Sequence, residues 1–404
     1  MRISTNQYYQ IGLYSILDQQ AGLIDSQSRV STGLRVNKPS DDPIATVTIV
    51  NLEQEIARTE RYTKNIETAM GSLAIEDATL QKITETLQRT RELILSGGNA
   101  TYGDDERESL AVEMDGLLDQ VLGFANSRNT NGDYMFAGNR VNITPFTQNV
   151  SGSYNYNGDQ GVREVQISSS TRIKANDSGY SVFQNIRNGN GDFQTQANVT
   201  NTGSGIINAG TVTDQTSYVR DTFQIDFVDI GGGVVGYDVT DSGGAVIATN
   251  VPYVDGDDIS FNGLSVSIDG SPDIGDNFSI NPSIRQDLFT TIQESIATLR
   301  INVSTPADAA YLNNQLQNSL INLDQAMQNI GFIQAQVGTR LNIAESQKFI
   351  NEDFNLTSKT TLSTIRDLDM AEAISDLNFR SISLEAAQAS FARVQNLSLF
   401  NFLR

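Results

Sequence analysis

Few residues of this chain have the types and spacing that chemistry requires. The run 254–258, Val-Asp-Gly-Asp-Asp, carries the oxygen ligands that calcium prefers, but it lacks the 12-residue spacing and terminal Glu of an EF-hand loop. Asp-Gly between strands is a common turn signal. The glycine run 231–233 is flexible enough to approach a phosphate, but no helix pattern follows it. Both runs are interpreted as turns.

Paired carboxylates could serve as general acid and base, as they do in glycosidases. The pairs Asp104/Asp105 and Glu352/Asp353 are better interpreted as helix caps or solvated faces. The chain contains no His and no Cys. This excludes Ser–His–Asp triads, thiol nucleophiles, disulfides and zinc–thiolate sites. We therefore expect a protein that is not an enzyme, with no catalytic residue, no cofactor and no metal.

The composition narrows the class of partner. The 404 residues carry a formal charge of −21 without a basic run, which argues against nucleic acid and against anionic membrane surfaces. No stretch of about 18 apolar residues is present, so no membrane insertion is expected. The first twenty residues lack the pattern of a cleaved signal peptide. Any export is expected to use a route without one.

Both ends of the chain have helical periodicity. Residues 9–34 show heptad spacing with Gln20 and Gln27 at seam positions. That pattern is typical of a coiled coil and also of an ordinary amphipathic helix on a core. The apolar positions expected on its inner face are Leu13, Ile16, Leu23, Val30 and Leu34.

A loop and a long helix follow. Asp42 is suited to cap a helix that has Pro43 at its first position and runs to about Leu95. A third helix is expected from Asp104-Asp105. The long helix carries a sevenfold series: Leu52, Thr59, Ile66, Leu73, Leu80, Leu87 and Ile94.

The middle of the chain alternates apolar and polar residues, as antiparallel β-sheet does. Residues 154–156 and 162–167 are predicted to form a hairpin around an Asn-Gly-Asp turn. Further strands are predicted at 221–228, 234–240, 245–250 and 259–268.

Helical periodicity returns with Leu288–Leu299, and Thr305 is suited to cap a next helix at Pro306. That helix carries Leu316, Leu323, Ile330 and Val337 on a sevenfold series. The last segment places apolar residues on one stripe and ends in an apolar tail that would be a liability on a free monomer. The stripe comprises Leu377, Leu384, Phe391, Val394 and Leu397.

These elements predict an α+β multidomain chain. Long N- and C-terminal helices form a coiled-coil or helical-bundle rod, and an antiparallel β domain is inserted into it. The expected domains are terminal assembly helices (1–40 with 366–404), a helical rod with a β-hairpin (41–189 with 284–365), and the β domain (190–283).

Two motifs, one near each end, resemble a known family. The run Val-Ser-Thr-Gly-Leu-Arg-Val-Asn at 30–37, followed by Asp41-Asp42, resembles the N-terminal signature of bacterial flagellins and their relatives. The run 367–373, Asp-Leu-Asp-Met-Ala-Glu-Ala, resembles the matching C-terminal signature. The start 1–7 and the segment 134–138 are more similar to hook-associated members of the family than to flagellins.

The resemblance implies a structural subunit at the hook–filament junction of the bacterial flagellum. It implies a ring of copies that connects the hook, through the first hook-associated protein, to the flagellin filament. It also implies export by the flagellar type III apparatus and an extracellular location on the flagellum. A cytoplasmic chaperone would hold the C-terminal helix before export. Two alternatives stay open: a flagellin filament subunit, and a secreted glycan-binding or glycan-acting protein that uses the β domain.

The expected site residues are therefore contact residues. The assembly interface comprises Leu13, Ile16, Leu23, Val30, Leu34, Arg35, Leu377, Leu384, Phe391, Val394 and Leu397. The chaperone would contact Leu384, Phe391, Leu397 and Phe400. A segment similar to the one that an innate immune receptor reads in flagellin comprises Gln88, Arg89, Arg91, Glu92 and Leu93, although its ordinary role is helix surface.

Overall fold

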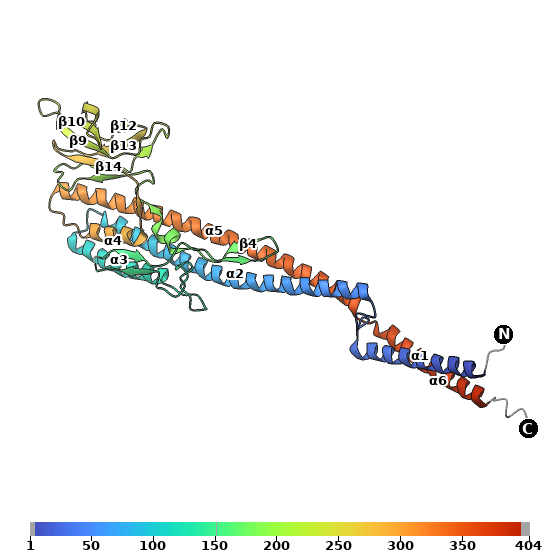
Figure 1. Cartoon of the computed structure of the whole chain (residues 1–404). Helices are drawn as coiled ribbons and strands as arrows, with labels where there is room; N and C mark the ends of the chain where they lie inside the picture. Colours follow the sequence, from blue (N-terminus) through green and yellow to red (C-terminus); the bar gives the residue numbers. More distant parts are fainter. Residues whose placement is uncertain (1–4, 151, 397–404) are drawn as a thin grey trace, which may run out of the picture. The chain divides into compact units, whose positions relative to one another are not determined.

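A computed structural model describes residues 5–150 and 152–396 (Figure 1). The chain divides into two compact units, unit 1 with residues 1–65 and 347–404, and unit 2 with residues 66–346. The α-helices are α1 (Thr5–Thr32), α2 (Pro43–Gly97), α3 (Asp104–Ala125), α4 (Leu288–Leu299), α5 (Pro306–Arg366) and α6 (Met370–Asn396). Among the residues described, none of these helices is both long and apolar enough to cross a membrane. The terminal helices and the inserted β domain confirm the predicted fold class.

The predicted helix starts are confirmed by their caps. The Asp42 carboxylate accepts a hydrogen bond from the Ala45 amide at 2.9 Å, which satisfies a free amide in the first turn of α2. At the start of α5, the Thr305 hydroxyl accepts from the Asp308 amide at 3.1 Å. The Asp308 carboxylate accepts from the Thr305 amide at 2.8 Å in return.

The sevenfold series of α2 and α5 form the helical core of unit 2. Ile66, Leu73, Leu80, Leu87 and Ile94 of α2 are fully buried. They share one apolar cluster with the α5 series and with the inner faces of α3 and α4. The rings of Phe146, Phe183 and Phe289 add an aromatic group to this cluster and lie 5.0–5.8 Å apart.

The prediction of a hairpin around Asn157-Gly158-Asp159 is wrong. The first strand, β2 (Tyr154–Tyr156), pairs with β1 (Phe146–Gln148), and β3 (Glu164–Gln166) pairs with β4 (Arg172–Lys174). The Asp159 carboxylate instead accepts from the amides of Asn139 and Gly161, each at 2.8 Å. The Asn-Gly-Asp run therefore binds the loop before β1 and does not close a two-residue turn.

The β domain has two sheets that share one core. The larger sheet has the order β11-β10-β9-β14-β6; the smaller has β12-β13-β7, with β8 also on β13. The core between them includes Phe193, Phe223, Phe227 and Phe278. The strands are β6 (Phe193–Ala197), β7 (Ile206–Ile207), β8 (Thr211–Val212), β9 (Phe223–Asp229), β10 (Val235–Asp241), β11 (Val246–Pro252), β12 (Asp258–Phe261), β13 (Leu264–Asp269) and β14 (Asn277–Pro282).

One predicted strand is two strands. Residues 259–268 divide into β12 and β13, which pair with each other as a hairpin. Asn262 and Gly263 join them with φ values of 42° and 76°. Two consecutive positive φ angles are what a two-residue hairpin turn requires, and Asn-Gly is the sequence that adopts them most readily. The Asn-Gly signal was present in the sequence, within a run that alternates on both sides of it.

Asparagines of α5 hold the β domain on the helix. Asn314, Asn318 and Asn322 are four residues apart, so they lie on one face of α5, and Figure 1 shows the sheets beside that helix. All three side chains are buried. Their partners are backbone groups of the β domain and of its entry: the Gly205 carbonyl, the Ile207 amide, the Thr195 carbonyl and the Gly189 amide, at 2.7–3.0 Å. The contact therefore depends on directional hydrogen bonds.

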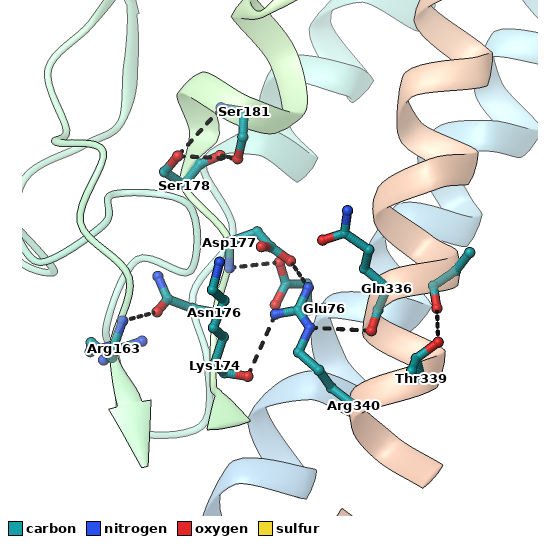
Figure 2. A network of polar contacts seen from close by, with 11 residues as sticks. Glu76, Arg163, Lys174, Asn176, Asp177, Ser178, Ser181, Gln336, Thr339 and Arg340 are labelled. Carbon is teal, nitrogen blue, oxygen red and sulfur yellow. Dashed lines mark hydrogen bonds and ion pairs between the residues drawn. The ribbon is translucent and has the colours of Figure 1, made fainter. Parts of the chain in front are cut away.

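A second buried polar network joins α2 and α5 to the loop after β4 (Figure 2). The Glu76 carboxylate accepts from the Asp177 amide at 3.1 Å. The Arg340 guanidinium pairs with the Asp177 carboxylate and donates to the Gln336 carbonyl at 3.2 Å. Burial, and then the negative charge of Asp177, hold the pKa of Glu76 well above its usual value, whereas Arg340 opposes that shift.

We predict that Asn314→Ala destabilises unit 2 by about 1–3 kcal/mol, because the buried Ile207 amide loses its acceptor. Gln317→Ala, at an exposed position of the same helix, is the control. Chemical denaturation measures the free energy of unfolding of both variants. Equal stability of the two would show that the asparagine row does not hold the β domain.

We predict that Glu76→Gln flattens the pH dependence of stability. The folded chain binds the Glu76 proton more tightly than the unfolded chain, so this contribution is present below pH 4.5 and is lost as pH rises through the folded pKa. Gln keeps an oxygen acceptor for the Asp177 amide but does not ionise. The stability of the variant relative to the wild type should therefore increase between pH 4.5 and 8. If the free energies of unfolding of variant and wild type changed equally with pH across this range, the prediction would be wrong.

Candidate assembly interface

The terminal helices α1 and α6 pair in opposite directions within unit 1 (Figure 1). At one end, the rings of Tyr9 and Phe391 meet edge to face, with centroids 6.0 Å apart. At the other end, the buried Ser26 hydroxyl donates to the Asp376 carboxylate at 2.8 Å. Gly12 lies under Phe391, where an added Cβ would come 2.8 Å from the ring, so the two helices approach closely at this point.

Most of the predicted interface residues lie on the facing sides of this pair. The half-buried ones on the two helices are Ile16, Leu23, Val30, Leu377, Leu384 and Phe391. Leu34 is half-buried in the turn after α1, where it forms a β-bridge with Asp367. The chaperone-contact residues Leu384 and Phe391 are thus partly covered by the pairing. The side chain of Val394 and the residues Leu397 and Phe400 lie outside the described part of the chain.

Three predicted seam positions of α1 are outside the seam. Leu13 is 50% exposed, and Gln20 and Gln27 are also exposed. The polar seam position is instead Ser26, which has the Asp376 carboxylate as its partner. The single chain therefore leaves these three positions uncovered, because α1 faces α6 through Gly12, Ile16, Leu23 and Ser26. That Leu13 belongs to the assembly interface stays a prediction.

A second apolar set faces away from the pairing, and the heptad stripe did not predict it. Phe379 is 70% exposed. We call the set the outward rows: Ile11, Tyr14, Leu17 and Ile24 on α1, with Ile374, Phe379 and Ile382 on α6. The sequence feature that indicates this second set is an excess of apolar residues, since each helix has more of them than one stripe holds.

The segments of α2 and α5 in unit 1 also carry large apolar residues on an exposed side. The sevenfold series, apolar in unit 2, continues here with small polar residues at buried positions: Thr59, Asn351 and Ser358. These segments also bury a small apolar cluster, formed by Ala45, Ile49, Ile56 and Leu362 with Val36 of the preceding turn. Other large apolar residues face outward, and Ile44 is 82% exposed. The other exposed apolar residues of these segments are Val47, Val50, Phe349, Ile350, Phe354 and Leu356.

The two signature motifs meet at the turns of unit 1. The Arg35 amide donates to the Arg366 carbonyl at 2.7 Å, and the Leu368 amide donates to the Gly33 carbonyl at 2.9 Å. The Arg35 guanidinium adds two hydrogen bonds to the Ile365 carbonyl, at 2.7 and 3.0 Å. The predicted interface residue Arg35 therefore ties the turn between α1 and α2 to the turn between α5 and α6.

The loop 37–41 is closed by one carboxylate. The Asp41 side chain accepts from the amides of Asn37 and Lys38, at 3.0 and 2.9 Å. These backbone hydrogen bonds lower the pKa of Asp41. The acidic residues of the signature thus organise backbone: Asp41 closes the loop, and Asp42 caps α2.

The receptor-like segment on α2 is partly occupied by contacts of this chain. Leu93 is 2% exposed. Arg89 forms an ion pair with Glu113 at 2.8 Å, and Arg91 forms one with Asp324 at 2.8 Å. Gln88 and Glu92 are exposed.

The glycine run 231–233 and the acidic run 254–258 lie at turns, as predicted. Gly231, Gly232 and Gly233 all have positive φ between β9 and β10, where the Asp229 carboxylate accepts two of their amides. The Asp255 carboxylate accepts the Gly270 amide at 2.6 Å. Within residues 5–150 and 152–396, no group of three or more Asp and Glu residues could hold a metal ion.

Comparisons with known proteins find similarity at both ends of the chain and in its middle. Residues 3–140 match the model of the bacterial flagellin N-terminal helical region, and residues 320–403 match that of the C-terminal helical region. The flagellar hook-associated protein 3 of Salmonella typhimurium is 26% identical, with 100% of both chains covered. A crystal structure of the flagellar hook-associated protein 3 of Legionella pneumophila is 31% identical, with 78% of this chain and 98% of that chain covered and a TM-score of 0.76. A crystal structure described as the flagellar junction protein of the same organism is also 31% identical, with 79% and 100% covered and a TM-score of 0.74.

We predict that Gly33→Ala destabilises unit 1 by about 1 kcal/mol, because Gly33 has a φ of +71°. No atom lies within 4 Å of an added Cβ there, so the cost is conformational and not steric. Gly33→Asn should lose less, since Asn tolerates this region better. Gly71→Ala, at an exposed helical position of α2, should be neutral or stabilising. A loss for Asn at position 33 as large as that for Ala would contradict this account.

Proposed function

This chain belongs to the flagellin family and has the structural role of a hook–filament junction protein, and we propose that its copies join into a ring through the outward rows of unit 1. Relatives of similar length are hook-associated proteins, and one is described as a flagellar junction protein. The observation that carries the proposal is the second, exposed apolar side of unit 1. Besides the apolar side chains that unit 1 covers itself, large apolar side chains are exposed on all four of its helical segments.

Burial of the outward rows supplies the driving force for assembly. Covering one large apolar side chain contributes about 1.5–3 kcal/mol. The seven outward-row residues can therefore offset the loss of translational freedom and side-chain entropy on association. Coulombic attraction between copies cannot be the main force, since each chain has a formal charge of −21.

The ring has two kinds of neighbour in this proposal. The first hook-associated protein lies on the hook side, and flagellin lies on the filament side. We place the protein outside the cell on the flagellum, after export by the flagellar type III apparatus. Before export, a chaperone covers α6 and the segment after it, because α6 has large apolar residues on its free side. The role is mechanical, and no catalytic activity is proposed.

We predict that the double variant Phe379→Ser, Ile382→Ser prevents self-association while leaving the monomer folded, because both side chains are exposed in the single chain. Val219→Ser, Val246→Ser is the matched control, with two exposed valines in the β domain. Sedimentation velocity measures association, and circular dichroism measures folding. The control should assemble like the wild type. Assembly by the 379/382 variant would contradict the proposal.

The same variants test the role in the bacterium that encodes the chain. In a strain lacking the gene, the 379/382 variant should leave hooks without filaments and release flagellin into the medium, whereas the control should restore filaments. Electron microscopy of the assembled wild type distinguishes a short ring from an extended filament. An extended filament formed by this chain alone would identify a flagellin and overturn the junction role.

A further inference from the structure

Three exposed arginines line one cavity where the β domain joins the helices of unit 2. The cavity has a volume of about 390 Å³ and is lined by Arg187, Arg220, Ser283, Ile284 and Arg285. Arg187 belongs to β5 (Ile186–Arg187) and Arg285 to β15 (Arg285–Gln286). Arg220 precedes β9. We call Arg187, Arg220 and Arg285 the arginine pocket.

The backbone around the pocket is fixed. The Ser283 hydroxyl donates to the Asn188 carbonyl at 2.7 Å, and the Ile284 amide donates to the Asn188 side-chain oxygen at 2.9 Å. The Ser283 amide donates to the Asp192 carbonyl at 2.9 Å. Entry and exit of the β domain are therefore held together, and the backbone next to Arg187 and Arg285 is fixed.

None of the three arginines has an acidic partner in the described part of the chain. Arg187 donates to the Gly191 carbonyl at 3.1 Å, Arg220 to the Ser283 carbonyl, and Arg285 to the Tyr180 hydroxyl at 3.3 Å. No ion pair within 4.0 Å involves any of them. By contrast, Arg300 on the helical side of unit 2 binds two carboxylates.

The placement of two of these charges is unfavourable without a ligand. Arg187 and Arg285 are direct partners in the antiparallel β5–β15 pair. Like charges at directly opposed positions destabilise a strand pair. The chain has 48 acidic and 27 basic residues, so acidic partners are abundant, yet none is among the residues that line this pocket. An anion between the two guanidinium groups would convert this repulsion into attraction.

The chemistry of the pocket selects the anion. A guanidinium presents a planar fork of N–H donors that matches the two oxygens of a carboxylate or a phosphate. Each of the three groups uses only part of its five donors on the contacts above. The cavity has room for one such group with its remaining waters. Ile284, which is 62% exposed, adds an apolar wall that a bare halide would not use.

We propose that the arginine pocket binds an oxyanion group, a carboxylate or a phosphate. The inference is independent of the junction role, because it rests on three arginines of unit 2 and not on the outward rows of unit 1. The group comes either from a free anion or from an acidic side chain of a second copy of this chain. In both cases the same three guanidinium groups hold it.

The first experiment uses the full chain and inorganic phosphate, with malonate as a dicarboxylate, each at constant ionic strength. Binding is measured by isothermal titration and by the shift of the melting temperature. We expect saturable binding that Arg220→Gln and Arg187→Gln each weaken at least tenfold. Arg220→Lys keeps the charge but loses the fork, and it should fall between the wild type and Arg220→Gln. Arg172→Gln changes an exposed arginine of β4 outside the pocket, and it should bind like the wild type.

The second experiment identifies the source of the anion. Self-association is followed by sedimentation at low and high salt. A loss of association and of its salt dependence in Arg220→Gln, but not in Arg172→Gln, would support the pocket with a side chain of a second copy as ligand. Saturable phosphate binding with unchanged association would support a free anion. Circular dichroism confirms that each variant is folded. If neither phosphate, malonate nor association distinguishes Arg220→Gln from Arg172→Gln, the proposal is wrong.

Discussion

The pairing of helices in unit 1 leaves many of its large apolar side chains uncovered, and the proposed assembly depends on this constraint. A helix pair that is stable alone buries its large apolar side chains in the seam. Here Thr59, Asn351 and Ser358 share the buried positions of α2 and α5 in unit 1 with a small apolar cluster, whereas Ile44 and Phe349 face outward. The same sevenfold series is apolar throughout unit 2. The large apolar core of unit 2 thus gives way to a smaller, partly polar one in unit 1, with exposed apolar residues that we propose other copies cover.

Unit 2 supplies a folded body whose parts are joined by directional contacts. The asparagines of α5 bind backbone groups of the β domain, and the Glu76–Asp177–Arg340 network joins α2, α5 and the loop between them. Removing one partner from such a buried network lowers the stability more than removing an apolar contact does, because it leaves a polar group without a partner. The arrangement favours one fixed placement of the β domain on its helix.

Much of this fold could be predicted from the sequence. Helix starts at Pro43 and Pro306, and the buried series of α2, follow from local capping chemistry and from periodicity. The hairpin at 154–167 could not, because Asn157-Gly158-Asp159 has turn chemistry whose actual partner, the loop at Asn139, depends on long-range packing. The outward rows were missed for a related reason. Periodicity shows which residues are apolar, but it does not show which of two apolar sides faces the helix partner.

The central claim is that the outward rows are covered by other copies of the chain. The absence of native Cys allows a direct measurement. Single variants Ile382→Cys and Val246→Cys place a thiol at two positions that are exposed in the monomer. Thiol labelling rates are compared between monomer and assembled protein. The account predicts fast labelling of both in the monomer, and at least tenfold protection at position 382 alone after assembly. Equal labelling of position 382 in monomer and assembly would contradict it.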